Sequence, residues 1–186
     1  VDLNLIEKYY TELLNDEEFL SEINEQIIVV REFYKKGIFK HEKLESIDYM
    51  AIQRIILYIL VRLYKPKVCV ETGVFYGGST CFILNALRRN GVGKLISIDL
   101  PANEIKELQR HHCVGDSEFI AEGLDVGFLV HKALKNNWTL IRGNSHEEIP
   151  KLNEKIDLFF HDSEHTFDFI KKEISIVFNK LSDEGL

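Results

Sequence analysis

Apolar residues recur at helical spacing through the first 65 residues of the chain. This spacing predicts helices over residues 3–14, 17 to about 34, and 46–64. The third segment is apolar nearly all round after Ala51, which indicates burial against a sheet. We therefore expect residues 1–65 to form an N-terminal helical extension. Its apolar helices are suited to covering the sheet, closing a ligand pocket, or pairing two copies of the chain as a homo-oligomer.

After Pro66 the pattern changes to short apolar runs that alternate with helical segments. These runs predict four strands, and the segments between and after them include predicted helices. The strands are expected at 68–71, 95–99, 138–141 and 156–160, and the helices after Ser79, at 147–152 and at 167–181. Such alternation indicates a parallel sheet covered on both faces. The fold class expected for residues 66–186 is α/β, a Rossmann-like, doubly wound and mostly parallel sheet.

Two features interrupt this regular pattern. Residues 101–137 are predicted helical at 105–112 and 127–136 but have no clear period between, so we expect an insertion on the ligand side of the sheet. The last predicted helix needs a following strand on which to return, so we expect the C-terminal strands of the sheet to lie beyond Leu186. Because the chain begins with Val1 rather than Met, we also expect a preceding segment.

Composition narrows the classes of partner. The chain has 186 residues, a formal net charge of -7, and 45% hydrophobic residues, which suits one globular domain. No run of Lys and Arg is longer than an isolated pair, so a nucleic-acid partner is not expected. The longest apolar run, residues 55–61, is far short of the roughly 20 residues that span a bilayer, so no membrane association is expected. Three cysteines at unrelated spacings predict no disulfide framework or zinc site and fit a reducing cytosol.

Candidate chemistry begins at a glycine-rich turn after the first predicted strand. Residues 71–79 read ETGVFYGGS, and the absence of a Cβ at Gly73 and Gly77 lets a ligand approach the backbone. Ser79 is expected to cap the following helix, whose first N–H groups suit an anionic group. The G-x-x-x-G-G spacing differs from the G-x-G-x-x-G typical of nicotinamide sites. A tight turn without a ligand is the alternative.

Two further polar clusters follow predicted strands, at the sheet edge where ligands bind in such folds. Asp99 ends the second strand, where a carboxylate can accept both hydroxyls of a ribose; a turn-forming aspartate is the alternative. The run HDSEH at 161–165 follows the fourth strand. Asp162 can bind a hard divalent ion, and His165 can act as a base near neutral pH. The alternative is that Ser163 caps the next helix and the histidines only form hydrogen bonds.

Together these motifs resemble those of class I S-adenosylmethionine-dependent methyltransferases. The resemblance is carried by VETGV at 70–74, GGST at 77–80, Ile98 with Asp99, GNS at 143–145 and IDLFFHDSEHT at 156–166. It is greatest to small-molecule O-methyltransferases, the branch that includes sugar O-methyltransferases and cephalosporin-hydroxylase-like proteins. It covers about residues 66–181, so the N-terminal helices are not part of it.

The resemblance implies S-adenosyl-L-methionine as the cofactor and a role for each matching residue. The glycine turn would hold the methionine end, Asp99 the ribose, and Asn144 with Ser145 the adenine edge. Asp162 would lie at the cofactor and ligate a divalent metal ion such as Mg²⁺, and His165 would be the base for the acceptor. The residues of the turn implied at the cofactor are Glu71, Thr72, Gly73, Gly77 and Ser79.

The implied function is transfer of a methyl group to a hydroxyl of a small molecule of sugar or natural-product type. The methyl would be displaced directly onto the acceptor oxygen while His165 takes the proton. Two other classes stay open. A nucleotide-binding oxidoreductase of Rossmann type shares the sheet and Asp99, and a non-catalytic binding or assembly domain would keep the fold without the chemistry.

Overall fold

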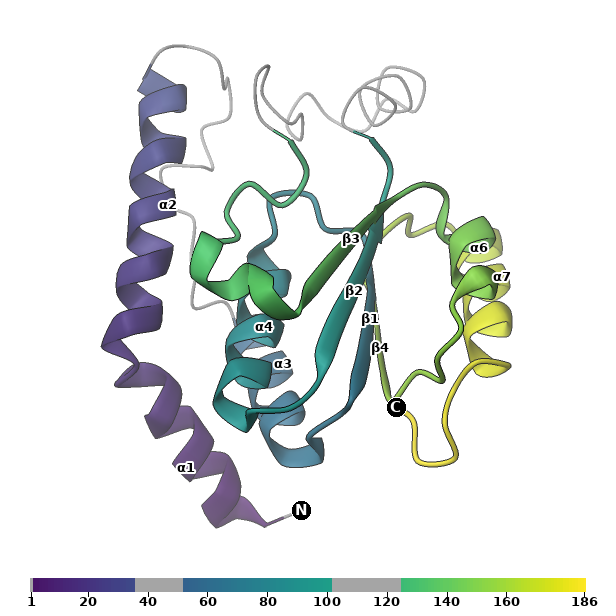
Figure 1. Cartoon of the computed structure of the whole chain (residues 1–186), viewed down its shortest axis with the longest axis horizontal. Helices are drawn as coiled ribbons and strands as arrows, with labels where there is room; N and C mark the ends of the chain where they lie inside the picture. The colour runs from purple at the N-terminus through teal and green to yellow at the C-terminus, as the bar shows by residue number, and fades with distance from the viewer. Residues whose placement is uncertain (1, 36–51, 102–124) are drawn as a thin grey trace.

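The computed structural model describes residues 2–35, 52–101 and 125–186. Its core is a four-stranded, all-parallel sheet in the order β3-β2-β1-β4 (Figure 1). The strands are β1 (Val68–Thr72), β2 (Lys94–Asp99), β3 (Trp138–Arg142) and β4 (Leu158–His161). Thr72 at the end of β1 registers with Ile98 of β2 and His161 of β4, so the carboxyl ends of these strands meet at one edge. The predicted parallel α/β sheet is confirmed.

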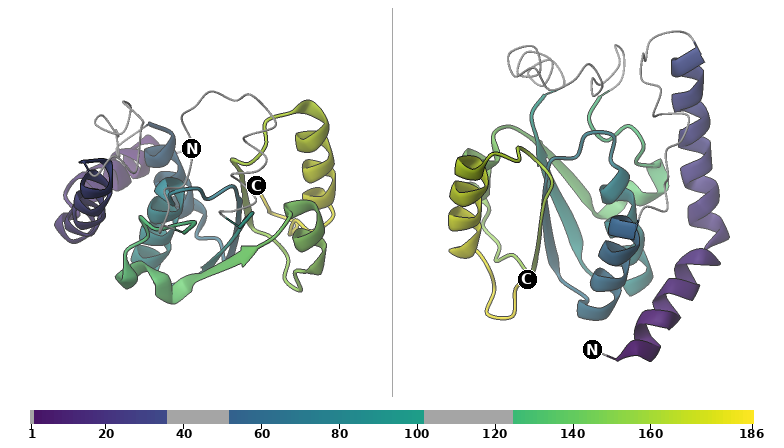
Figure 2. Two further views of the ribbon diagram at one scale, coloured as in Figure 1. Left: turned by 90° about the horizontal axis from the view of Figure 1, so that it is seen from above. Right: turned by 180° about the vertical axis from the view of Figure 1, so that it is seen from behind.

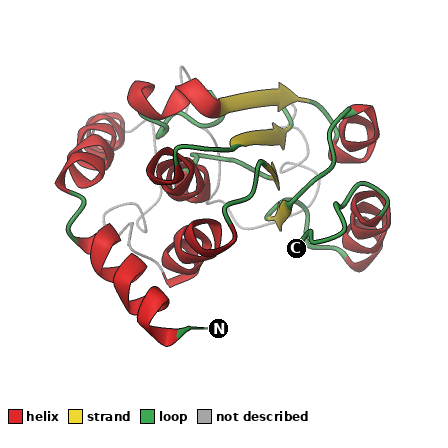
Figure 3. Cartoon of the chain, turned by 60° about the horizontal axis from the view of Figure 1, so that its bottom comes forward, coloured by secondary structure: helices red, strands yellow, loops and turns green. Residues whose placement is uncertain are grey.

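Helices cover both faces of this sheet, as Figures 2 and 3 show from further sides. One face carries α1 (Leu3–Leu14), α2 (Glu17–Lys35), α3 (Ile52–Tyr64) and α4 (Gly78–Asn90). The other face carries α6 (Ser145–Glu148), the 3-10 turn η3 (Ile149–Lys151) and α7 (Phe167–Phe178). A 3-10 helix, η2 (Lys132–Asn137), leads into β3. Within the described ranges, every helix is too short or too polar to cross a lipid bilayer.

The N-terminal helices share one apolar core with the sheet. Phe19 of α2 has no exposed surface, and its ring packs edge-on against Phe82 of α4 with centroids 5.1 Å apart. Between α1 and α2, the buried carboxylate of Asp16 pairs with Arg89 near the end of α4. The described part of the predicted extension is therefore integrated into the domain, because α4 supplies both an apolar packing partner and the cation that pairs with the buried carboxylate.

The predicted helix cap at Ser79 is wrong, and so is the alternative in which Ser163 caps the next helix. Gly77, with φ +90°, is the N-cap of α4, and Ser79 lies inside the first turn. A left-handed cap favours glycine because a Cβ is strained there. Thr166, rather than Ser163, is the N-cap of α7.

Some element boundaries also differ from the predicted ones. The helix predicted at 127–136 is the shorter 3-10 helix η2, β4 begins two residues later than expected, and α7 ends at Phe178. The predicted start of the third helix at residue 46 and the predicted helix at 105–112 lie outside the described residues. Beyond α7 the chain returns alongside β4, where the amide of Leu186 donates to the carbonyl of Asp157 at 3.0 Å.

Candidate functional site

The loop between β1 and α4 reverses the chain at the sheet edge through three left-handed residues. These are Gly73 at φ +79°, Phe75 at +50° and Gly77 at +90°. A Cβ built on Gly73 would lie 2.1 Å from the carbonyl oxygen of Asp162, in the segment after β4. Only glycine fits this contact. The space that the sequence suggested for a ligand at the Cα of Gly73 is therefore occupied by the backbone of Asp162.

Asp99 joins the end of β2 to this loop. Its Oδ2 accepts hydrogen bonds of 2.8 Å from the amides of both Val74 and Phe75, and its Oδ1 accepts one of 2.8 Å from the amide of Leu100. Burial raises the pKa of Asp99, and the three amides oppose that shift. A carboxylate accepts about four hydrogen bonds, so room for one ribose hydroxyl remains. Asp99 thus lies at the predicted edge and also shapes the loop.

Glu71 is a fully buried carboxylate on the α4 side of the sheet. Its Oε1 accepts from the hydroxyl of Ser79 at 2.5 Å. Its Oε2 accepts from the hydroxyls of Thr80 at 2.7 Å and Ser97 at 2.8 Å. Burial raises the pKa of Glu71 to about 7, although these hydroxyls favour the ionised form. Glu71 and Ser79, both predicted at the methionine end, face each other and fasten β1 to α4.

A second buried carboxylate, Glu173 of α7, lies on the opposite side of the sheet and has no exposed surface. Its Oε2 accepts from the hydroxyl of Thr72 at 3.0 Å and lies 2.5 Å from Nδ1 of His161. Its Oε1 accepts from the hydroxyl of Ser145. Thr72 and Ser145, which the resemblance places at the cofactor, therefore direct their hydroxyls at Glu173 in this structure.

The sequence motifs gave no role to Glu173. One signal could have found it: Glu173 lies four residues before Val177, and both are buried on the same face of α7. A carboxylate in the apolar stripe of an amphipathic helix is costly to bury unless it is paired and hydrogen-bonded. Such a position predicts a polar partner on the facing sheet, although it does not say which residues supply it.

Asn144 lies at the same edge of the sheet, in the exposed turn after β3. Its Oδ1 accepts from the amide of His146 at 2.9 Å, which makes it the N-cap of α6. The preceding amide, of Gly143, donates to the carbonyl of Asp99 at 2.9 Å. This bond places the turn beside Asp99, next to the residue expected to bind ribose.

Asp162 and His165 lie together in the exposed turn between β4 and α7. The distance from Nε2 of His165 to Oδ1 of Asp162 is 3.8 Å, and their side chains are 68% and 53% exposed. The ring of His165 also meets that of His161 edge to face, with centroids 5.5 Å apart. The Nε2 atom of His161 is buried and makes no hydrogen bond in the described structure. The predicted base is therefore accessible to a substrate, whereas His161 is directed inward.

The metal ion expected at Asp162 stays a prediction. Across residues 2–35, 52–101 and 125–186, there is no group of three or more His, Cys, Asp or Glu side chains that could hold a metal ion. Mg²⁺ requires near-octahedral oxygen coordination, supplied in proteins by carboxylates, substrate oxygens and water. Asp162 and the neighbouring His165 are not enough ligands by themselves, so no catalytic step is assigned to a metal.

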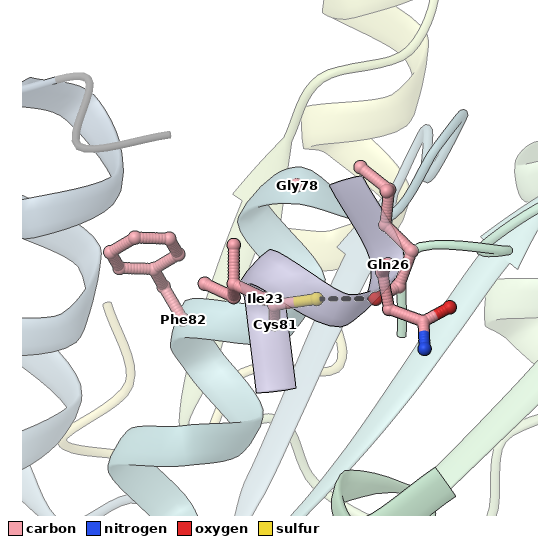
Figure 4. Close-up of a pocket in the computed structure, with 6 residues that line it drawn as sticks. Ile23, Gln26, Gly78, Cys81 and Phe82 are labelled. Carbon is pink, nitrogen blue, oxygen red and sulfur yellow. Dashed lines mark hydrogen bonds between the residues drawn. The ribbon is translucent and has the colours of Figure 1, made fainter. Parts of the chain in front are cut away.

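A small crevice lies between α2 and the start of α4 (Figure 4). It encloses about 10 Å³, roughly the room that one water molecule needs. Its lining residues are Ile23, Gln26, Gly78, Cys81, Phe82 and Leu129. A nucleoside cannot enter so small a space, so the candidate site remains the sheet edge beside the glycine loop.

Comparison with known proteins identifies the family. A family model described as a methyltransferase domain matches residues 70–186, well over half of the chain. The chain therefore belongs to this methyltransferase family. The match begins within β1 and includes the glycine loop, Asp99, and the turn with Asp162 and His165. No curated protein sequence matches the chain.

Solved structures share the fold at low sequence identity. SAH-bound PaMTH1 of Podospora anserina is 17% identical with a TM-score of 0.55, over 88% of this chain and 59% of that chain. The O-methyltransferase TomG of Streptomyces achromogenes, in complex with SAM, is 18% identical with a TM-score of 0.51, over 71% and 52%. The Bacillus cereus O-methyltransferase in complex with SAH is 12% identical with a TM-score of 0.55, over 94% and 67%. The chain thus spans about half to two thirds of these proteins and has the Rossmann-like fold that its sequence predicted.

Proposed function

We propose that this chain binds S-adenosyl-L-methionine and that the protein transfers its methyl group to a hydroxyl of a small molecule, of sugar or natural-product type. The observation that carries the proposal is the glycine loop tied to Asp99 at the carboxyl edge of a parallel sheet, within a matched methyltransferase domain. Ligands bind at this edge in open α/β sheets. The relatives described with bound SAM or SAH support the choice of cofactor.

The proposed reaction is a direct displacement. The bond from the cofactor sulfur to the methyl carbon breaks as the bond from that carbon to the acceptor oxygen forms, which leaves a neutral thioether. The acceptor hydroxyl loses its proton, and His165 is the proposed base because its ring is exposed beside this edge. Holding the methyl in line with the oxygen supplies much of the rate gain.

Binding calorimetry with S-adenosylmethionine, S-adenosylhomocysteine and NAD tests the proposal on this chain. We expect the first two to bind at one site per chain and NAD not to bind. Binding of NAD alone would indicate a nucleotide-binding oxidoreductase. Binding of none of the three would indicate a non-catalytic binding or assembly domain.

A homo-oligomer formed through the N-terminal helices is a further part of this proposal. It is supported by apolar side chains that α1 leaves in solvent, such as Leu3 at 76% and Leu14 at 44% exposed. Light scattering during gel filtration should give a mass above the 21.6 kDa of one chain, and a monomer would overturn the proposed homo-oligomer.

A reducing cytosol is the proposed location, in keeping with the free, buried thiols of Cys69 and Cys81.

A further inference from the structure

Glu173 connects four separate elements of the fold through one buried side chain. Its carboxylate, on α7, binds the last residue of β1, the last residue of β4 and the first residue of α6. Those partners are Thr72 at 3.0 Å, His161 at 2.5 Å and Ser145. Glu173 and Ser145 are buried, and His161 is only 17% exposed, so water does not substitute for these bonds. The hydrogen-bond partners of Glu173 are therefore protein groups rather than water.

Each of these partners is adjacent in the chain to a segment of the candidate cofactor site. Thr72 precedes Gly73, the first residue of the glycine loop. The other two partners precede Asp162 and follow Asn144. One carboxylate therefore sets the spacing between the three segments that are proposed to surround the cofactor.

We propose that Glu173 is a positioning residue for cofactor binding, which fixes the glycine loop, the Asn144 turn and the Asp162 turn relative to one another. This inference rests on the proposed function. A buried donor that loses its acceptor carries the full cost of desolvation. The three segments therefore keep their spacing, because shifting one of them would leave a buried donor unpaired. Glu71 performs the corresponding task on the opposite side of the sheet, where it binds Ser79.

The test is the affinity of Glu173→Gln for S-adenosylmethionine and S-adenosylhomocysteine, measured by calorimetry on the chain well below its unfolding temperature. Glutamine keeps the size of the side chain but replaces one acceptor oxygen with a donor. We expect Kd to rise roughly tenfold or more, the usual size for hydrogen bonds to a charged group. Asp16→Asn is the matched control, since Asp16 is a buried carboxylate at the α1–α2 junction that also accepts from side-chain donors. It should lower the unfolding temperature without changing Kd.

A second pair of variants keeps the test decisive if Glu173→Gln does not fold. In His161→Asn the side-chain amide can take the place of Nδ1–H and donate to Glu173, whereas His161→Leu has no donor. We expect the first to keep an affinity near that of the unmodified chain and the second to weaken it. Equal affinities in the unmodified chain, Glu173→Gln and His161→Leu would overturn the positioning role alone. Failure of the unmodified chain to bind either cofactor form would overturn the proposed function together with it.

Discussion

The carboxylate of Asp99 accepts a 2.8 Å hydrogen bond from the backbone amide of Phe75. Phe75 has φ +50°, a left-handed conformation that is uncommon for residues other than glycine. The amide of Val74, the residue before it, donates to the same oxygen at 2.8 Å. The end of β2 therefore helps to hold the loop after β1, and the residue expected to bind ribose also shapes the part of the site expected to bind the methionine end.

Asp99→Ala is expected to weaken S-adenosylmethionine binding by about 1–3 kcal/mol, the range for hydrogen bonds to a charged group. The variant removes both the proposed ribose contact and the support of the loop. Calorimetry measures the change, and Asp183→Ala, which removes an exposed aspartate, is the control. An affinity equal to that of the unmodified chain would rule out Asp99 as the ribose ligand.

Gly73→Ala should abolish cofactor binding and lower the unfolding temperature. The new Cβ would lie 2.1 Å from the carbonyl oxygen of Asp162, so the loop and the segment after β4 must separate. Gly91→Ala is the matched control: it has a similar φ of +67°, but its Cβ meets no atom within 4 Å. It should show only backbone strain, roughly 1–2 kcal/mol in unfolding free energy, and an unchanged Kd. If both variants behave alike, the contact with Asp162 has no importance for the site.

His165→Ala should lower the turnover number of the whole protein by roughly 10²–10⁴-fold, the usual contribution of a positioned base. Cofactor Kd and unfolding temperature should hardly change, because the side chain is 68% exposed. Single-turnover rates with bound S-adenosylmethionine separate the chemical step from binding. A variant with the unmodified rate would exclude His165 as the base.

Because of Glu71, the free energy of unfolding should depend on pH below neutrality. Its pKa is raised from its ordinary value of 4.5 to about 7, so between these values the folded chain keeps a proton that the unfolded chain releases. Its contribution to stability therefore falls as pH rises through this window, by at most about 1.4 kcal/mol per pH unit. Urea unfolding of the unmodified chain and of Glu71→Gln from pH 4.5 to 8 should show the difference between them changing below pH 7 and level above it. A constant difference would contradict the raised pKa.

Asp16→Ala should destabilise the whole domain by on the order of 3 kcal/mol, the lower end for breaking a buried ion pair. The lower end applies because Arg89 is 38% exposed, although Asp16 itself is buried. Hydrogen bonds from Arg89 and Asn85 outweigh burial and lower the pKa of Asp16, so the lost carboxylate is the ionised form. Thermal unfolding should remain a single transition. A separate early transition would show that α1 and α2 unfold independently of the sheet.

The sequence alone determined the parts of this protein that depend on local pattern. Apolar spacing of 3.6 residues predicted α1 and α2, and short apolar runs predicted all four strands. The reason is that burial of one face of an element makes its apolar residues recur with the period of that element. Glycines and polar residues after the strands predicted the ligand edge of the sheet. The order of Gly73, Asp99, Asn144 and Asp162 along the chain was enough to indicate the methyltransferase family.

Only the tertiary structure decided what those residues touch. The hydroxyl of Thr72 meets a carboxylate 101 positions away in the chain, on Glu173, and no local period encodes that distance. Gly73 is required by its contact with the backbone carbonyl of Asp162, and a sequence motif does not show that the segment after β4 lies so close. A buried polar group forms hydrogen bonds with the partners that the packed elements bring close to it. The free-energy cost of leaving such a group unpaired exceeds the conformational preferences of its own segment. The bonding of Glu71, Asp99 and Glu173 was therefore decided by the assembled sheet edge rather than by the segments that contain them.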